Sequence, residues 1–215
     1  MIVLELFAGT RSISRAFERR GHKTVSIDWC KDFTGIDLYK DINEINSRTI
    51  IKLCGGVPDV IWASPDCTTY SVAAISSHRR RNPESGNLEP VSEYAKACDK
   101  TNKHVLDLIH ELKPRLYFIE NPRGGLRKMD FMKGLYRYTV TYCQYGDHRM
   151  KPTDIWTNHP DPKFKPPCSP NAPCHEAAPR GSKTGTQGIK GSADRARIPD
   201  QLCDHIVEIC EEEIK

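Results

Sequence analysis

The 215-residue chain has no apolar stretch that approaches the roughly 20 residues needed to cross a membrane. Residues 1–6 have neither the basic start nor the long apolar region of a secretory signal. The nine cysteines are odd in number and mostly stand singly in apolar patterns, which argues against a disulfide framework. We therefore expect a cytosolic protein with no membrane contact, built as one principal domain with a small appendage.

Net charge is absent outside one segment. The formal net charge of +4 falls within residues 151–197, which hold eight basic and four acidic residues, so the rest of the chain is neutral. Two interpretations of this segment remain open: a solvated loop, or a surface that faces phosphates.

Apolar runs alternate with helical patterns along the chain. We predict strands at residues 2–6, 24–28, 60–63, 116–120, 136–145 and 155–157, and helices at 12–20, 42–53, 92–112, 126–135 and from 199 onward. Residues 68–90 have no clear period and are predicted as a long loop. The alternation predicts an α/β fold with a doubly wound, mainly parallel sheet, whose ligands bind at the carboxyl ends of its strands.

The first strand leads into a turn made by Phe7, Ala8, Gly9 and Thr10. Such a turn lets the backbone approach a ligand at a helix N-terminus. Asp28 ends the next strand about 20 residues later, the spacing at which an acid accepts hydrogen bonds from ribose hydroxyls. Trp29 can stack on adenine, and Asp41 with Ile42 can bind the adenine amine.

A dinucleotide fingerprint would need a second glycine where Arg11 stands. This absence disfavours a pyrophosphate. It favours S-adenosylmethionine, which has ribose and adenine but no phosphate. A plain structural turn at Gly9, a capping role for Asp28 and a core position for Trp29 remain alternatives.

The strand at 60–63 is followed by Ser64-Pro65-Asp66-Cys67, which places a thiol at the sheet edge, and the strand at 116–120 ends in Glu120 before Asn121-Pro122. In this order the motifs resemble those of the cytosine-5 DNA methyltransferase family. The similarity takes in the turn at 7–9, the pairs 28–29 and 41–42, residues 64–67 and 120–122, residues 145–146 with Lys151, and the last helix.

The resemblance implies a DNA cytosine-5 methyltransferase that uses S-adenosylmethionine. Cys67 would add to carbon 6 of a flipped cytosine, Glu120 would hold the ring at N3 and the amine, and Lys151 would supply positive charge. Asp66 disfavours the thiolate of Cys67, so Lys151, an arginine or the substrate must activate it. The family also implies that Pro65 contacts the cofactor, and that double-stranded DNA is bound by Ser71, Arg79, Arg80, Arg81, Asn121 and Arg123.

The resemblance divides the chain into a catalytic domain (1–157), a reduced target-recognition segment (158–197) and a C-terminal helix (198–215) that packs back on the catalytic domain. The shortness suggests a phage or other viral gene, with a role in restriction-modification inside a bacterial host. We expect a monomer.

Departures from the family pattern keep alternatives open. Asp66 and Thr68 replace the usual Pro and Gln around the cysteine, and Arg149, Lys151 and Thr153 replace a Gln and two Arg. The same reaction on transfer RNA, or a catalytically silent DNA-binding regulator on this fold, is compatible with these changes. An amino-methyltransferase fits less well, because Cys67 stands where its motif needs an aromatic residue.

Cys168, Cys174 and His175 lie in the reduced segment, and with His159 they could form a tetrahedral zinc site. The spacing matches no recognised zinc finger, so free cysteines in a proline-rich loop are the alternative.

Overall fold

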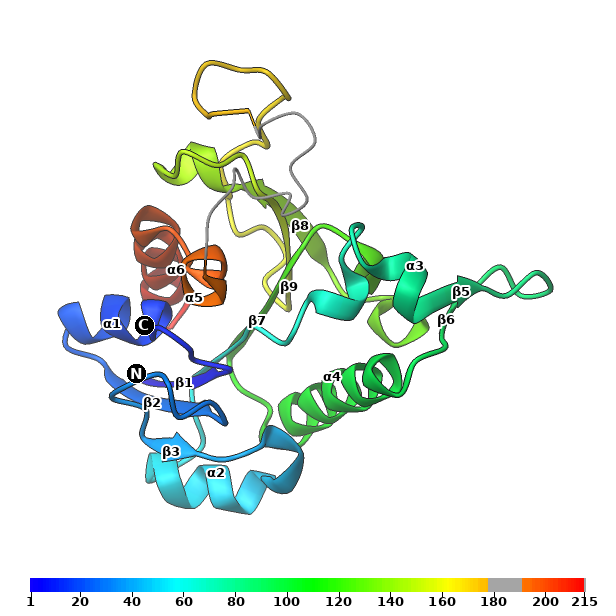
Figure 1. Ribbon diagram of the computed structural model, residues 1–215. Coiled ribbons are helices and arrows are strands. Elements are labelled where there is room, and N and C mark those ends of the chain that lie inside the picture. The colour runs from blue at the N-terminus through cyan, green and yellow to red at the C-terminus, as the bar shows by residue number, and fades with distance from the viewer. Residues whose placement is uncertain (178–190, 215) are drawn as a thin grey trace.

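The computed structural model describes residues 1–177 and 191–214, and its centre is a twisted sheet (Figure 1). Seven strands run in the order β3-β2-β1-β4-β7-β9-β8. Their bounds are β1 Ile2–Leu6, β2 Lys23–Asp28, β3 Leu38–Tyr39, β4 Val60–Ala63, β7 Leu116–Pro122, β8 Arg137–Thr141 and β9 Pro152–Thr157. The first five of this order are parallel, and β9 is antiparallel to both β7 and β8. The predicted α/β fold class is confirmed.

Helices connect these strands. The α-helices are α1 Ser12–Arg19, α2 Ser47–Cys54, α3 Ile75–His78, α4 Glu93–Leu112, α5 Ser192–Ala196 and α6 Asp200–Glu213. The 3-10 helices are η1 Ile42–Glu44, η2 Thr68–Tyr70, η3 Gly125–Lys128, η4 Asp130–Met132 and η5 Tyr142–Tyr145.

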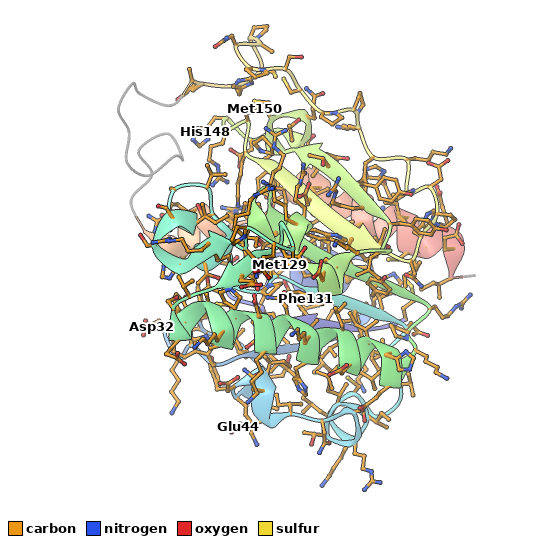
Figure 2. The ribbon with its side chains drawn as sticks, turned by 90° about the vertical axis from the view of Figure 1, so that its right-hand side faces the viewer. Asp32, Glu44, Met129, Phe131, His148 and Met150 are labelled. Carbon is orange, nitrogen blue, oxygen red and sulfur yellow. The ribbon has the colours of Figure 1, made fainter. Side chains whose placement is uncertain are left out.

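Alternating side chains of the central strands build two cores. Val3 and Trp62 pack toward α1 and α6 on one side, while Leu4 and Ile61 pack toward α2 and α4 on the other. Figure 1 shows α1 and α6 together on one side of the sheet and α4 on the opposite side. The view in Figure 2 shows α4 running across its face of the sheet, with Met129 close above it. Both faces are covered, so ligands can approach only the edges where the strands end.

Capping side chains explain where several helices begin. Ser92 accepts a hydrogen bond from the Ala95 backbone N–H at 3.1 Å, so α4 starts where the sequence predicts. The predicted helix at 42–53 is instead two pieces, because the Asn46 side chain caps a new helix by accepting from the Thr49 N–H at 3.0 Å.

Three other segments also differ from the sequence prediction. Residues 68–90 are partly ordered, with η2, α3 and a hairpin of β5 (Arg79–Arg81) and β6 (Leu88–Pro90). Residues 126–135 hold the 3-10 helices η3 and η4 where we expected one helix, and the expected strand at 136–145 ends at Thr141 and continues as η5.

The last helix packs beside the first, as the resemblance implies. Buried Leu202 and Ile206 of α6 share a core cluster with Ile13 and Phe17 of α1. No helix among the described residues is both long and apolar enough to cross a bilayer. Three of the basic residues expected to enrich the segment 151–197, namely Arg180, Lys183 and Lys190, lie outside the described residues.

Candidate active site

The parallel pair β4 and β7 brings Cys67 and Glu120 to one edge of the sheet. Ala63 ends β4 opposite Ile119, so Glu120 lies at the level where the chain leaves β4 toward Cys67. The Asn121 amide donates to the Pro65 backbone carbonyl at 2.9 Å and ties the segment before Cys67 to the end of β7. Two chain segments that are more than 50 residues apart thus meet where parallel strands expose their carboxyl ends.

Lys151 enters from the antiparallel side. Because β9 runs against β7, with Pro122 opposite Thr153, the residue just before β9 lies at the same edge. Its Nζ donates to the Arg195 backbone carbonyl at 2.8 Å and lies 4.5 Å from the centre of the Tyr142 ring. Burial lowers the pKa of Lys151, and the charge of Glu120 opposes that shift.

Glu120 is a buried carboxyl held by a phenol. Its side chain accepts a hydrogen bond from the Tyr142 hydroxyl at 3.1 Å, and the residue is 6 % exposed. Burial raises the pKa of Glu120, while the positive charge of Lys151 and hydrogen bonds from Tyr142 and Ser64 act in the opposite direction. A proton is therefore held more readily here than on a carboxyl in water.

The thiol of Cys67 is protonated at neutral pH. Burial raises its pKa to about 11, Glu120 and Asp66 add to the shift, and Lys151 opposes it. Asp66 disfavours the thiolate of Cys67, as the sequence analysis expected. Asp66 is itself held by the backbone N–H of Thr68 at 2.6 Å and by the hydroxyl of Tyr94.

A cavity of about 280 Å³ is lined in part by Pro65 and Asp66, the two residues before Cys67. Six of the nine predicted cofactor-binding residues line it: Phe7, Asp28, Trp29, Asp41, Ile42 and Pro65. Trp29 is 70 % exposed, so it is not a core residue and its ring is free to stack on a ligand. The cavity borders the Cys67 segment, which places a bound molecule next to the thiol.

Apart from Phe7, the turn after β1 shapes this cavity and does not line it. Gly9 has φ 48°, a left-handed conformation that favours glycine, and its backbone N–H donates to Asp28 Oδ2 at 2.8 Å. Asp28 Oδ1 accepts from the Cys30 N–H at 2.8 Å. Ala8 is buried, and the Thr10 hydroxyl pairs with that of Ser12 at 3.0 Å. Gly9 therefore acts by orienting Asp28, and Ala8 and Thr10 lie outside the cavity lining.

Sequence reasoning missed the α4 wall of the cavity. Tyr94, Ala97, Cys98, Thr101 and Asn102 line it from that helix, together with Ile27, Lys40 and Asn43. The available signal was Asn102, a polar residue on the same stripe as Cys98 and Val105, where a plain core helix would have an apolar side chain.

Comparison with known proteins adds one full-length relative. A Frog virus 3 protein named as a probable DNA (cytosine-5)-methyltransferase is 26 % identical over 226 residues, covering 98 % of this chain and 100 % of the relative. This likeness over nearly the whole chain supports the resemblance to the cytosine-5 DNA methyltransferase family that the motifs indicate. No protein-family model matches it.

Solved structures of methyltransferases have the same fold. A protein described as a DNA modification methyltransferase from an E. coli prophage matches with a TM-score of 0.53 at 14 % identity, over 73 % of this chain and 46 % of that one. The Entamoeba histolytica methyltransferase EhMeth matches at 0.52 and 16 %, over 77 % and 55 %. The S. pombe Dnmt2 methyltransferase matches at 0.50 and 13 %, over 73 % and 48 %. The chain spans about half the length of these solved structures.

Two residues expected on the nucleic-acid side are internal in this chain. Arg79 is 2 % exposed and pairs with Asp99 at 2.7 Å, while its Nε donates to the Thr69 carbonyl at 2.9 Å. Asn121 is fully buried and holds Pro65. The expectation that these two residues bind nucleic acid is wrong, because both side chains are buried and engaged inside the protein.

The other residues expected to bind nucleic acid reach the surface. Arg80, Arg81 and Arg123 are exposed, and Ser71 is half-buried at the end of η2. The Arg79–Asp99 pair fixes the base of the hairpin on α4, so Arg80 and Arg81 project from an anchored element. Three exposed arginines thus remain in the segments that follow the candidate catalytic residues, two after Cys67 and one after Glu120.

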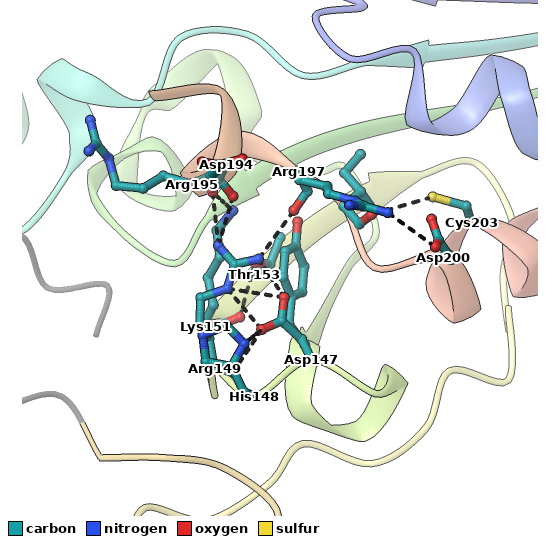
Figure 3. Close-up of polar contacts among 12 residues, drawn as sticks. Asp147, His148, Arg149, Lys151, Thr153, Asp194, Arg195, Arg197, Asp200 and Cys203 are labelled. Carbon is teal, nitrogen blue, oxygen red and sulfur yellow. Dashed lines mark hydrogen bonds and ion pairs between the residues drawn. The ribbon is translucent and has the colours of Figure 1, made fainter. Parts of the chain in front are cut away.

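The loop before β9 is fastened to the segment at 194–197 (Figure 3). Arg149 is 4 % exposed, pairs with Asp147, and donates to the backbone carbonyls of Asp194 at 3.2 Å and Arg195 at 3.3 Å. Arg149 is therefore structural, and among the replaced motif residues Lys151 alone interacts with Glu120 and Cys67.

The predicted metal residues come together, but with a different fourth member. Ligand atoms of Cys168, Cys174, His175 and Cys143 all lie within 4.8 Å of one another. His159 is not among them, because it is buried and pairs with Glu213 at 3.2 Å. The expectation of His159 as a ligand is wrong.

A wider, open hollow of about 380 Å³ lies over β8 and the segment after β9. It is lined by Tyr138, Thr139, Asp161, Lys163, Phe164, Lys165, Pro166 and Pro167. None of the predicted catalytic or cofactor residues faces it, so its larger volume does not make it the better candidate for the active site.

Proposed function

We propose that this chain transfers a methyl group from S-adenosylmethionine to carbon 5 of cytosine in DNA. One observation carries the proposal: a thiol, a buried carboxyl and a lysine meet at the strand edge that borders an acid-lined cavity. The full-length likeness to a viral protein named as a probable DNA (cytosine-5)-methyltransferase supports the same reaction.

The cavity suits S-adenosylmethionine by charge. Asp28, Asp41 and Asp66 line it, and Lys40 is its single basic lining residue. A cavity with three carboxylates favours a sulfonium cation over a phosphate. Asp28 would hold the ribose hydroxyls, Trp29 would stack on the adenine, and Asp41 would accept from its amine. When bound, this molecule supplies the methyl group.

Cys67 supplies the nucleophile in this proposal. Its sulfur forms a bond to carbon 6 of cytosine, and the electron pair of the 5,6 double bond moves to carbon 5, which takes the methyl group. Loss of the carbon 5 proton and release of the thiolate restore the ring. The raised pKa of Cys67 means that its proton must leave when the substrate binds, and Lys151 is the nearby cation that stabilises the resulting thiolate.

Glu120 orients the ring and stabilises the adduct. Its raised pKa lets the carboxyl hold a proton that it can donate to N3, where negative charge develops once sulfur has added to carbon 6. Tyr142 fixes this carboxyl through its hydroxyl. The exocyclic amine of cytosine then donates to the second carboxyl oxygen.

The base must leave the duplex to reach this edge. We infer that the hairpin at 79–90 lies along the nucleic acid, with Arg80, Arg81 and Arg123 on its phosphates, and that Ser71 lies beside the flipped base. We also infer a catalytic domain at 1–157, a recognition segment at 158–197 and a closing helix at 198–215, acting as a monomer. The Frog virus 3 relative supports a viral origin, while a phage source, a bacterial host and restriction-modification stay predictions.

Methyl transfer from labelled S-adenosylmethionine to duplex DNA, with transfer RNA in parallel, tests the substrate. We expect labelled 5-methylcytosine in DNA and a loss of more than about a thousandfold in Cys67→Ser. Cys30→Ser is the matched control and should keep full activity, because only the backbone N–H of Cys30 contacts Asp28 and serine retains that group. If label appeared in transfer RNA alone, the substrate would be RNA and the proposed DNA substrate would be wrong.

Trapping on DNA that contains 5-fluorocytosine tests the covalent step. Fluorine cannot leave carbon 5 as a proton does, so the sulfur-carbon bond should persist and be recovered on the peptide that contains Cys67. A chain that binds DNA but neither methylates nor forms this adduct would be a silent regulator, and our proposal would be wrong.

A further inference from the structure

Three thiols and one imidazole converge beside η5, away from Cys67. The Cys168 and Cys174 sulfurs lie 3.1 Å apart, and His175 Nδ1 lies 3.8 Å from the first and 3.5 Å from the second. Cys143 Sγ completes the group, with all four atoms within 4.8 Å of one another. Cys143 is buried, Cys174 is exposed, and the other two are half-buried, so the cluster lies at the surface with one wall in the protein.

We propose that Cys143, Cys168, Cys174 and His175 bind one zinc ion in a closed, structural site. Zinc prefers four tetrahedral ligands drawn from thiolate and imidazole, at about 2.3 Å for sulfur and about 2.0 Å for nitrogen. Those bond lengths require sulfurs about 3.8 Å apart and a nitrogen about 3.5 Å from each sulfur. The sulfur–nitrogen separations of 3.8 and 3.5 Å lie close to these values, whereas the two sulfurs at 3.1 Å would move apart by about 0.7 Å when the ion binds.

Other chemistry fits the cluster less well. A disulfide needs sulfurs at about 2.05 Å, well below the 3.1 Å between Cys168 and Cys174. Magnesium and calcium prefer oxygen ligands, and the four converging groups offer none. Four protein ligands leave no open position for a substrate, so the site would be structural and not catalytic.

Hydrogen bonds hold the ligand-bearing backbone in place. The Cys168 backbone N–H donates to the Thr141 hydroxyl at 2.8 Å, directly at the end of β8. The Glu176 N–H donates to the His148 carbonyl at 2.9 Å, and the Gln144 amide lies 3.8 Å from the Cys174 sulfur. The cluster is therefore supported from both sides of the loop and does not rest on the side chains alone.

The segment that carries three of the ligands has almost no core of its own. Between residues 158 and 177, only His159 and Pro162 are buried, and no helix or strand is present. A stretch with so little apolar burial cannot offset the entropy of ordering its backbone. Binding of a structural zinc ion supplies that free energy, as it does in small metal-dependent domains.

The fourth ligand joins the site to the candidate active site. Cys143 follows Tyr142, whose hydroxyl donates to Glu120. A metal bound to Cys143 would fix η5, and with it the phenol that orients the Glu120 carboxyl. This functional consequence rests on the proposed methyltransferase function, whereas metal binding does not.

Zinc content of the full chain tests the proposal directly. We expect one zinc per chain after purification under reducing conditions without chelator, or after addition of zinc chloride and dialysis. Cys143→Ser and Cys174→Ser should each lose most of this zinc, whereas Cys30→Ser and Cys54→Ser should retain it. Loss from the first pair only would identify these thiols as ligands.

Cobalt(II) substitution of the wild-type chain covers the case in which a variant fails to fold. Thiolate coordination should give intense charge-transfer absorption together with visible bands typical of a tetrahedral ion. A chain that takes up neither zinc nor cobalt, equal zinc in all four variants, or a native disulfide between Cys168 and Cys174 in peptide mapping would each overturn the proposal. Because metal content is measured without DNA, an inactive enzyme that binds zinc would refute only the proposed function.

Discussion

Alkylation of Cys67 as a function of pH is a direct test of its electrostatic setting. With a pKa of about 11, the thiolate fraction at pH 7 is about 10⁻⁴, compared with about 10⁻² at the ordinary value of 9.0. A more basic thiolate is also more nucleophilic, and this recovers roughly sixfold to tenfold of the hundredfold deficit. We therefore expect iodoacetamide to react with Cys67 about tenfold more slowly than with an ordinary thiol at pH 7, with partial burial slowing it further.

The slope of the alkylation rate against pH carries more information than the absolute rate, because limited access to the thiol scales the rate equally at every pH. The rate at Cys67, followed by mass spectrometry of its peptide, should rise about tenfold per pH unit from 7 to 10. Lys151→Met removes the cation that lowers the pKa, so Cys67 should react more slowly between pH 8 and 10. Asp66→Asn should make it faster.

Lys100→Met on the exposed side of α4 is the matched control, since it removes one positive charge from the chain away from the strand edge. It should leave the alkylation profile unchanged. A wild-type profile that levels off by pH 9, or a Lys151→Met profile equal to that of the control, would refute the claim that burial and these charges set the state of the thiol.

Two further predictions concern buried charges. Burial raises the pKa of Glu5 from 4.5 to about 7, so its contribution to stability is present below pH 4.5 and lost as pH rises through 7. In urea unfolding, the free energy of unfolding of the wild-type chain should fall by about 2.5 kcal/mol between pH 5 and 8 because of Glu5, and Glu5→Gln should lack this fall. An unchanged pH dependence in the variant would contradict this. Asp99→Asn should destabilise the chain by about 3–5 kcal/mol because it leaves the Arg79 charge buried without its partner. The double variant Arg79→Met with Asp99→Leu should recover most of that loss in the same assay.

The strand edge could be predicted because each element there depends on local sequence. Short apolar runs ending in Ala63 and Glu120 indicate buried parallel strands, and parallel strands expose their carboxyl ends together. Cys67 and Glu120 were therefore predicted to meet, and Asp28 was predicted from its distance to the first turn. These inferences need no knowledge of long-range packing.

The orientation of single side chains could not be predicted in the same way. Arg79, Arg80 and Arg81 are alike in sequence, yet the β5 strand turns Arg79 inward and leaves the next two exposed. Its partner Asp99 lies 20 residues later, on a helix that also carries apolar residues at nearby positions. Cys143 was similarly hidden among apolar neighbours, so its convergence with Cys168 required the fold.

Small size gives this chain a particular problem of anchoring. The loop at 146–152 and the segments at 158–177 and 191–197 contact η5 or Lys151 but contribute few buried apolar side chains. Buried Arg149 instead crosslinks the loop to backbone carbonyls at 194–197, and Lys151 donates to one of the same carbonyls. If the Cys143 cluster binds zinc, the middle segment is fastened by a metal, and both fastenings act next to Tyr142 and Glu120. Positioning of the carboxyl would then depend on polar and metal links, so chelation should loosen the active site while leaving the apolar cores on both faces of the sheet intact.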